Sequence, residues 1–197
     1  ANGSALEAFS VVARDNLLAL SETQVPVNVA VAAVNDAPTL SGSYTFAGLQ
    51  ASAIAPTGVT VASLLNTSSA TTSSDVDTGA APVGIAITGS VGKGTWQIST
   101  DSTNGTNGTW SAQGAVSDAG AKLLAASNYV PYLPDGESGE SGSSAASLTY
   151  RASDGTSGAS GTADTTLNGG SSAFSSTAVT APLAVTAVTK PLDLTLT

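Results

Sequence analysis

The sequence predicts an all-β protein, an antiparallel β-sandwich with long Gly/Ser-rich loops. Three observations support this prediction. Segments in which β-branched or aromatic residues alternate with small or polar ones recur along the 197 residues, and this period of two is typical of half-buried strands. Clusters of Gly, Ser, Asn and Asp separate these segments and favour turns. Helical periodicity is nearly absent, and a chain of this length is able to bury a sizeable core.

The clearest strand is Val25–Ala33, in which every second residue from Val25 to Val31 is valine. Val179–Val188 is its counterpart near the other end of the chain. Only Val59–Leu65 and Asp118–Ala126 favour short helical turns, whereas Gly136–Ala146 and Ser153–Ser176 are expected to be surface loops. The full set of expected strands is Ala8–Ala13, Val25–Ala33, Ser43–Ala47, Val83–Thr88, Thr95–Ser99, Thr109–Gln113, Tyr129–Tyr132, Ser147–Ala152 and Thr177–Val188.

Two Val-rich strands are each followed closely by proline, at Pro38 and at Pro191. Proline after a strand marks a junction between modules. We therefore predict that residues 1–36 are the C-terminal strands of a preceding module and that residues 37–188 form one sandwich. Residues 189–197 then begin a following linker or strand. Inside the sandwich we expect Trp96, Leu123, Leu124, Tyr150 and the alternate valines of Val179–Val188.

The charge of the chain excludes one class of partner. Five Lys and Arg stand against fourteen Asp and Glu, for a net charge of −9, so no basic patch is available to neutralise nucleic-acid phosphates. No apolar run approaches the roughly 20 residues of a membrane span, which predicts no membrane insertion. The chain has no Cys, His or Met, and we expect a processed or excised fragment of an extracellular bacterial protein whose export signal lies elsewhere.

Short motifs give the sequence a family resemblance. Ala13-Arg14-Asp15, Leu20-Ser21 and the linker Val34-Asn35-Asp36-Ala37-Pro38 resemble the end of a cadherin-like repeat and its junction. The same kind of junction occurs in tandem repeats of giant bacterial surface proteins and adhesins. The motifs of the next module that are similar to repeats of those proteins are Asp75-Val76-Asp77, Gly84-Ile85-Ala86, Gly94-Thr95-Trp96, Trp110, Leu123-Leu124, Pro134-Asp135, Tyr150-Arg151-Ala152, Asp154-Gly155-Thr156, Gly169-Gly170 and Ala173-Phe174-Ser175.

This resemblance implies an immunoglobulin-like (cadherin-like) sandwich repeat at the bacterial cell surface, acting as an adhesin-type spacer. Two positions depart from the family. Ser153 stands where the family commonly has tryptophan, and Thr189-Lys190 replaces Asn-Asp at the second junction. The second junction is therefore expected to have lost any ligand that the first one binds.

Calcium is the one cofactor that the resemblance implies. In cadherin-like arrays the ion lies between modules and takes several carboxylate and carbonyl oxygens. Carried over to this chain, the ligands are Asn35, Asp36, Asp75, Asp77 and Asp154. The linker departs from the family pattern at its first and last ligand positions, where this chain has alanine. The alternative is that these acids are turn formers that bond nearby backbone amides.

No catalytic residue is expected, and we predict that the chain is not an enzyme. Glu137 and Glu140 form a pair of carboxylates of the kind that glycoside hydrolysis uses. They lie in a Gly/Ser-rich stretch, however, and a solvated loop is the favoured interpretation. Serine is abundant, but the chain has no histidine to activate it and no Gly-x-Ser-x-Gly elbow.

Four aromatic residues, Trp96, Trp110, Tyr129 and Tyr132, are candidates for a carbohydrate-stacking platform. Core packing is the favoured alternative, above all for Trp96, because aromatic side chains dominate such interiors. Carbohydrate is thus a possible partner that no other feature of the sequence supports. Asn2, Asn66, Asn104 and Asn107 stand in Asn-x-Ser/Thr sequons, which arise by chance in Thr-rich sequence.

Residues 1–36 contain two apolar-patterned strands but not the rest of a module. An isolated hairpin is marginally stable in water, so its valine face needs a cover. Three elements are candidates for this cover: an upstream part of the polypeptide, the flank of the following module, or a neighbouring identical subunit. The third would be strand complementation. We therefore carry two functions, a spacer repeat and a self-assembling subunit of an extracellular filament or surface layer.

Overall fold

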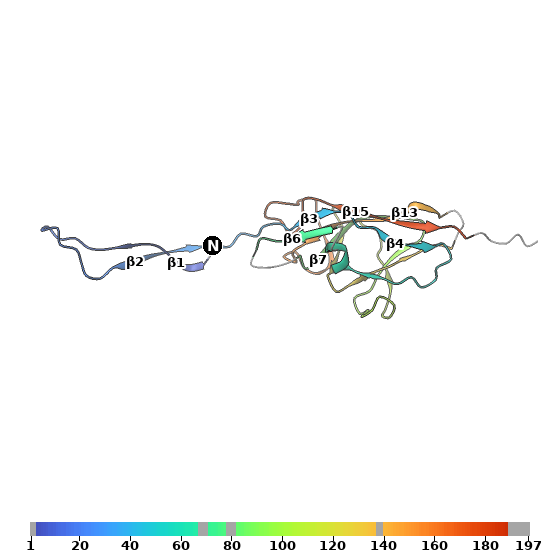
Figure 1. The fold of residues 1–197 in the computed structure, drawn as a ribbon, viewed down its shortest axis with the longest axis horizontal. Helices are drawn as coiled ribbons and strands as arrows, with labels where there is room; N and C mark the ends of the chain where they lie inside the picture. The colour runs from blue at the N-terminus through green and yellow to red at the C-terminus, as the bar shows by residue number, and fades with distance from the viewer. Residues whose placement is uncertain (1–2, 67–70, 78–81, 137–139, 189–197) are drawn as a thin grey trace, which may run out of the picture. The chain divides into compact units, whose positions relative to one another are not determined.

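A computed structural model describes residues 3–66, 71–77, 82–136 and 140–188, and the chain divides into two compact units (Figure 1). The first unit is Ala1–Asn35, which we call the hairpin unit, and the second is Asp36–Thr197, which we call the sandwich unit. The division falls one residue before the boundary expected from sequence. Residues 189–197, expected to begin a linker or strand, lie outside the described residues.

The hairpin unit is a pair of antiparallel strands, β1 (Gly3–Val11) and β2 (Val25–Val31). The alternation of valines in β2 produces the expected strand, and Val25 pairs with Val11. The loop between the strands is held by the Asp15 carboxylate, which accepts hydrogen bonds from two backbone N–H groups of the loop. Among the described residues the unit forms no other strand, and most of its apolar side chains are exposed to solvent.

The sandwich unit contains a six-stranded sheet in the order β14-β10-β7-β13-β15-β4. All neighbours in it are antiparallel except β15 and β4, which are parallel. Three smaller sheets, β12-β8-β9, β5-β11 and β3-β6, complete the unit. Its elements are β3 (Thr39–Gly42), β4 (Phe46–Gln50), β5 (Val59–Thr60), α1 (Val61–Leu65), β6 (Thr71–Ser74), β7 (Gly84–Val91), β8 (Thr95–Ile98), β9 (Ser111–Ala112), β10 (Ala121–Ala125), β11 (Tyr129–Val130), β12 (Tyr132–Leu133), β13 (Gly142–Ser153), β14 (Ser160–Ala163) and β15 (Val179–Thr186).

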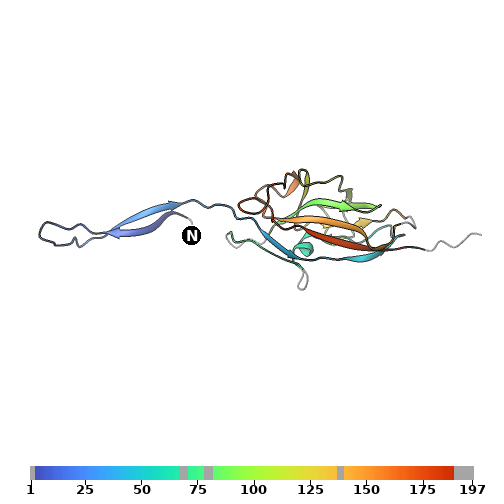
Figure 2. The same cartoon turned by 90° about the horizontal axis from the view of Figure 1, so that it is seen from above.

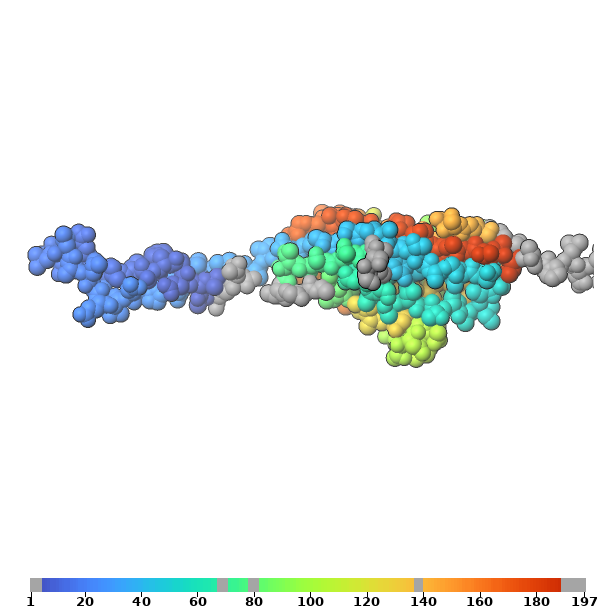
Figure 3. Space-filling model, viewed as in Figure 1, coloured from blue at the N-terminus to red at the C-terminus, as the bar shows by residue number. Residues whose placement is uncertain are grey.

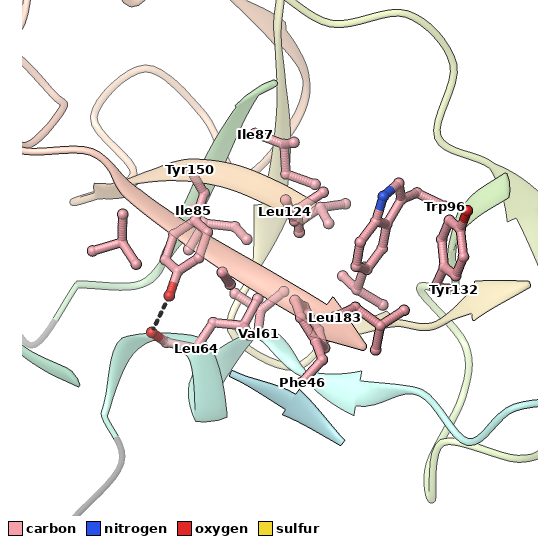
Figure 4. Close-up of a cluster of buried hydrophobic side chains, with 14 of the residues drawn as sticks. Phe46, Val61, Leu64, Ile85, Ile87, Trp96, Leu124, Tyr132, Tyr150 and Leu183 are labelled. Atoms are coloured by element: carbon pink, nitrogen blue, oxygen red, sulfur yellow. Dashed lines mark hydrogen bonds between the residues drawn. The ribbon is translucent and has the colours of Figure 1, made fainter. Parts of the chain in front are cut away.

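The main core lies between the six-stranded sheet and the smaller sheets with helix α1, an arrangement compatible with the expected β-sandwich (Figure 2). Strand β15 buries every second residue from Val179 to Val185, as its alternation predicts. Trp96 packs between Phe46 and Tyr132, with ring centroids 5.0 and 4.9 Å apart (Figure 4). The Tyr150 hydroxyl donates a hydrogen bond of 2.7 Å to the Leu64 carbonyl.

The expectation that Leu123 faces this core is wrong, although Trp96, Leu124 and Tyr150 do face it. Neighbouring residues of a strand point to opposite faces of the sheet, so Leu123 and Leu124 cannot share one core. Leu123 lies on the outer face of the six-stranded sheet, in a second buried cluster with Phe174. The segment that carries Phe174, expected to be a surface loop, covers this face.

The structure also corrects the local assignments. Asp118–Ala126, expected to be a helical turn, contains strand β10, because pairing with β7 and β14 outweighs the helical preference of its alanines and leucines. Helix α1 is the other expected turn, and the Thr60 side chain caps it by accepting the Ser63 N–H. Strands β13 and β14 begin inside stretches expected to be loops. Only the last two residues of the expected strand Ser43–Ala47 lie in a strand, β4, and the other three lie between β3 and β4.

Candidate functional site

Three of the five residues proposed for calcium are linked by hydrogen bonds in the sandwich unit. The Asp77 carboxylate accepts the backbone N–H of Asp36 at 2.8 Å, and the Asp75 carboxylate accepts the backbone N–H of Asp77 at 2.9 Å. The linker residue that opens the unit is therefore joined to the Asp-x-Asp loop that follows β6. Ala37 is fixed in the same region by its N–H, which bonds the Gly170 carbonyl at 2.7 Å.

The Asp75 carboxylate carries an unusual oxygen. Its Oδ2 atom is shielded from water and has no hydrogen-bond partner in the described part of the chain. Buried polar atoms are nearly always paired, and a carboxylate oxygen in this state fits a hard cation such as calcium. This one atom is the observation that the calcium interpretation explains and the turn-former interpretation does not.

The other two proposed ligands lie in other segments of the chain. The Asp154 carboxylate accepts the N–H and the hydroxyl of Thr156 in its own loop, which is the turn-forming role. Asn35 belongs to the hairpin unit. Among the residues described, no three acidic side chains converge in a way that would hold a metal ion, and the five-ligand site stays a prediction.

Glu140 has a role that sequence reasoning missed. It is only 2% exposed, whereas a solvated loop was expected. Its carboxylate accepts hydrogen bonds from the backbone N–H groups of Lys93 and Gly94 at 2.9 and 3.2 Å, from that of Asp135 at 3.2 Å, and from the Tyr132 hydroxyl. Glu140 thus ties the β7–β8 turn to the segment after β12. Glu137, its proposed dyad partner, lies outside the described residues.

The environment of Glu140 favours its charged form. Burial alone would raise the pKa of Glu140, but the hydrogen bonds from Tyr132 and the three backbone N–H groups lower it, and the net direction is downward. The same pair acts oppositely on Tyr132, whose pKa is raised by burial and by its hydrogen bond to Glu140. The arrangement suits a fixed structural anion. No local pattern distinguishes Glu140 from Glu137, so only the fold reveals this role.

The four candidate platform aromatics separate into two groups. Trp96 and Tyr132 are buried in the core, which excludes them from a surface platform. Trp110 is half-buried and lines a hollow of about 330 Å³ on the sandwich unit, together with Ile54 and Gln97. Tyr129 is also half-buried, and its hydroxyl donates to the Thr103 carbonyl at 3.0 Å.

The sequon residues Asn104 and Asn107 are part of a hydrogen-bonded loop, residues 99–109. The Asn104 side-chain oxygen accepts the N–H groups of Thr106 and Asn107, and the Asn107 oxygen accepts the Ser102 hydroxyl. The Asn66 oxygen accepts the Ser73 N–H at 3.2 Å. Asn2 lies outside the described residues. These bonds give the asparagines a structural role as turn formers.

Comparison with known proteins adds no identity: no family model, no curated protein and no solved structure matches the chain. Within the described ranges, no helix has the length and apolar character needed to cross a membrane.

Proposed function

We propose that this chain is a structural, non-catalytic part of a secreted bacterial cell-surface protein, in which the sandwich unit is an immunoglobulin-like (cadherin-like) spacer repeat. In such a protein the neighbours of each unit are other modules of the same polypeptide. The observation that supports the proposal most directly is the path of the chain through the sandwich unit.

That path runs from one end of the unit to the other. Strands β4 and β15 are parallel, with Phe46 opposite Leu183 and Gln50 opposite Thr186. The last strand therefore ends where β4 ends, and the Ala51 N–H bonds the Thr186 carbonyl at 2.9 Å. Figure 2 shows the segment before β3 and the end of β15 at opposite ends of this unit. This geometry suits a repeat that adds length to an array.

Sedimentation tests the spacer directly. A spacer stays monomeric as its concentration rises, because its contacts are with covalently linked neighbours. We expect a single sedimenting species from micromolar to millimolar concentration and no regular polymers by electron microscopy. Regular fibres or two-dimensional arrays of the purified chain would contradict the spacer and favour the second function below.

The exposed hairpin favours a second function, a self-assembling subunit that uses strand complementation. Phe9, Val25 and Val29 are 58%, 58% and 45% exposed, and covering such side chains is favourable. If a neighbouring subunit covers them, contacts that do not close into a ring generate a polymer. Deleting residues 1–35 would then abolish assembly and leave the sandwich unit folded. Polymers formed by the truncated chain would exclude strand complementation.

Calcium binding belongs to the same proposal. The proposed ligands are the five residues Asn35, Asp36, Asp75, Asp77 and Asp154. The proposal is supported by the orphaned Asp75 oxygen and by the Asp77 carboxylate, which accepts the Asp36 backbone N–H. Calcium would offset the mutual repulsion of these acids. We expect calorimetric heat on titration and a higher melting temperature, both lost in Asp75→Asn. A titration without heat and without a change in melting temperature would remove calcium from the proposal.

A further inference from the structure

The hollow beside Trp110 is built from three segments of the sandwich unit. Its floor is the outer face of the small sheet β12-β8-β9, where Gln97 and Leu133 lie. Trp96 and Ile98, the neighbours of Gln97 in β8, are buried in the core, so alternation turns the Gln97 side chain outward. The walls are residues 54–56 on one side and Thr106 with Trp110 on the other.

The walls are held in place before any ligand arrives. The Gly58 N–H bonds the Gly105 carbonyl at 2.7 Å, which joins the two walls, and Tyr129 bonds Thr103 in the 99–109 loop. The Trp110 ring lies against Gly58: a Cβ on that glycine would sit 2.9 Å from the Cη2 atom of the ring. The Trp110 ring is able to lie in this position because Gly58 has no side chain. Figure 3 shows the segment that includes the 99–109 loop, in yellow-green, protruding at the lower edge of the sandwich unit.

The lining has a distinct chemistry. It combines an aromatic ring with an amide and a hydroxyl, and none of its seven residues is ionisable. The Thr106 hydroxyl already donates to Asn104 and keeps its capacity to accept. In the described part of the chain, neither the Gln97 amide nor the Trp110 indole N–H has a hydrogen-bond partner. Apolar surface with a few uncharged polar groups is typical of a small-molecule site, and 300 Å³ is about the lower end of such volumes.

We infer that this hollow binds an uncharged sugar ring, such as a terminal hexopyranose of a neutral glycan. The apolar face of the ring packs on Trp110, and its hydroxyls bond the Gln97 amide and the Thr106 hydroxyl. An anionic sugar is disfavoured because the chain carries a net charge of −9 and the lining offers no cation.

A peptide fits this hollow less well. Peptides bind sheets chiefly by adding a strand to an open edge. Gln97 lies on β8, the middle strand of its sheet, and both edges of β8 are already paired, with β12 and with β9. The floor therefore presents side chains rather than free backbone groups, which suits a sugar ring with hydroxyls around its rim.

Saturation-transfer NMR on the full chain tests this inference. The probes are the methyl glycosides of glucose, galactose, mannose and N-acetylglucosamine, with glucuronate as an anionic comparison and a proline-rich peptide as the alternative ligand. We expect at least one neutral glycoside to bind with a dissociation constant on the order of 1 mM, typical of few contacts. Its binding should shift tryptophan fluorescence, because Trp96 is buried and Trp110 is the accessible indole.

Variants locate the site. Trp110→Ala and Gln97→Ala should each weaken binding about tenfold or more, whereas Leu167→Ala, an exposed apolar control in another loop, should leave it unchanged. If Trp110→Ala fails to fold, the binding of the glycoside to Gln97→Ala tests the site, because the Gln97 side chain points outward and its removal leaves the core intact. The inference is overturned if no neutral glycoside binds, if binding survives both hollow variants, or if glucuronate or the peptide binds more tightly than every neutral glycoside.

Discussion

Strand β2 of the hairpin unit and strand β15 of the sandwich unit have nearly the same sequence pattern but opposite surroundings. Both alternate valine or other apolar residues with small or polar ones. In β15 the alternate side chains are buried, whereas in β2 all but one residue are exposed. The pattern therefore predicts that a strand forms and which of its faces is apolar, but the tertiary partners decide whether that face is covered.

The difference has an energetic consequence. Burying a side chain such as Val or Leu stabilises a fold by about 1.5–3 kcal/mol, and β15 supplies several such side chains to the core while β2 supplies none among the described residues. The sandwich unit should therefore carry nearly all the unfolding free energy of the chain. Substitutions in the two units test this asymmetry.

The largest expected effect is in the core strand. Leu183 is 2% exposed, and Leu183→Ala should lower the free energy of unfolding by about 2–5 kcal/mol, because it removes apolar contacts and leaves a cavity. Val29→Ala in β2 is the matched control and should change it by less than about 0.5 kcal/mol. Urea unfolding measures both. Equal losses would show that the hairpin unit is covered and folds cooperatively with the sandwich unit.

The next effect concerns the buried anion. Glu140→Gln should cost about 1–3 kcal/mol, because a neutral amide replaces an acceptor of four hydrogen bonds and turns an N–H toward donors. Glu7→Gln, on the exposed β1 strand, makes the same charge change and should have little effect. If the two variants unfold at the same urea concentration, the Glu140 hydrogen bonds contribute no net stability.

Glu140 also predicts a pH dependence. The pKa of Glu140 is lowered in the folded chain from its ordinary value of 4.5, so its contribution is fully present above that value. It is lost as the pH falls through the lower folded pKa. Wild type should therefore lose its stability advantage over Glu140→Gln on acidification below about pH 4.5. Parallel pH profiles of the two proteins would contradict this linkage.

A smaller effect is expected at the hydroxyl of Tyr150. Tyr150→Phe removes the 2.7 Å hydrogen bond to the Leu64 carbonyl but keeps the ring in the core. Loss of one buried bond should cost about 1 kcal/mol, which thermal unfolding resolves. Tyr129→Phe removes a hydroxyl whose partner lies in an exposed loop and should cost less. The reverse order would show that the Tyr150 bond does not anchor α1.

The smallest effect is at the surface ion pair. The Arg151 Nε atom lies 3.6 Å from the Asp118 carboxylate, whose side chain is 55% exposed. Exposed ion pairs contribute little, so Asp118→Asn should cost at most about 1 kcal/mol and less in high salt. Arg151→Ala should cost more, because the guanidinium also donates to the carbonyls of Ser175 and Ser176, next to Phe174 of the second buried cluster. Equal costs would assign the whole effect to the ion pair.

The sequence by itself predicted the elements whose signal is local. Alternation located the end of β1 and most of β2, β7, β8 and β15. The preference of aromatic side chains for interiors predicted the burial of Trp96. The Asp-x-Asp motif drew attention to the loop that the structure joins to Asp36. These predictions succeed because alternation and turn-forming residues are local signals, each contained within a few consecutive residues of the sequence.

Only the tertiary structure decided which partners those elements meet. Ala121–Ala125 is a strand because it pairs with β7 and β14. Leu124 faces the main core, so its neighbour Leu123 points to the opposite face of the sheet. The Glu140 carboxylate meets the backbone N–H groups of Lys93 and Gly94, which are more than 40 residues away in sequence, and that of Asp135 nearby. The fold also buries the Oδ2 atom of Asp75 without a hydrogen-bond partner in the described part of the chain. Burial is a property of long-range contacts, so two similar local patterns, the alternating apolar residues of β2 and β15, differ in exposure: one is in solvent and the other in a core.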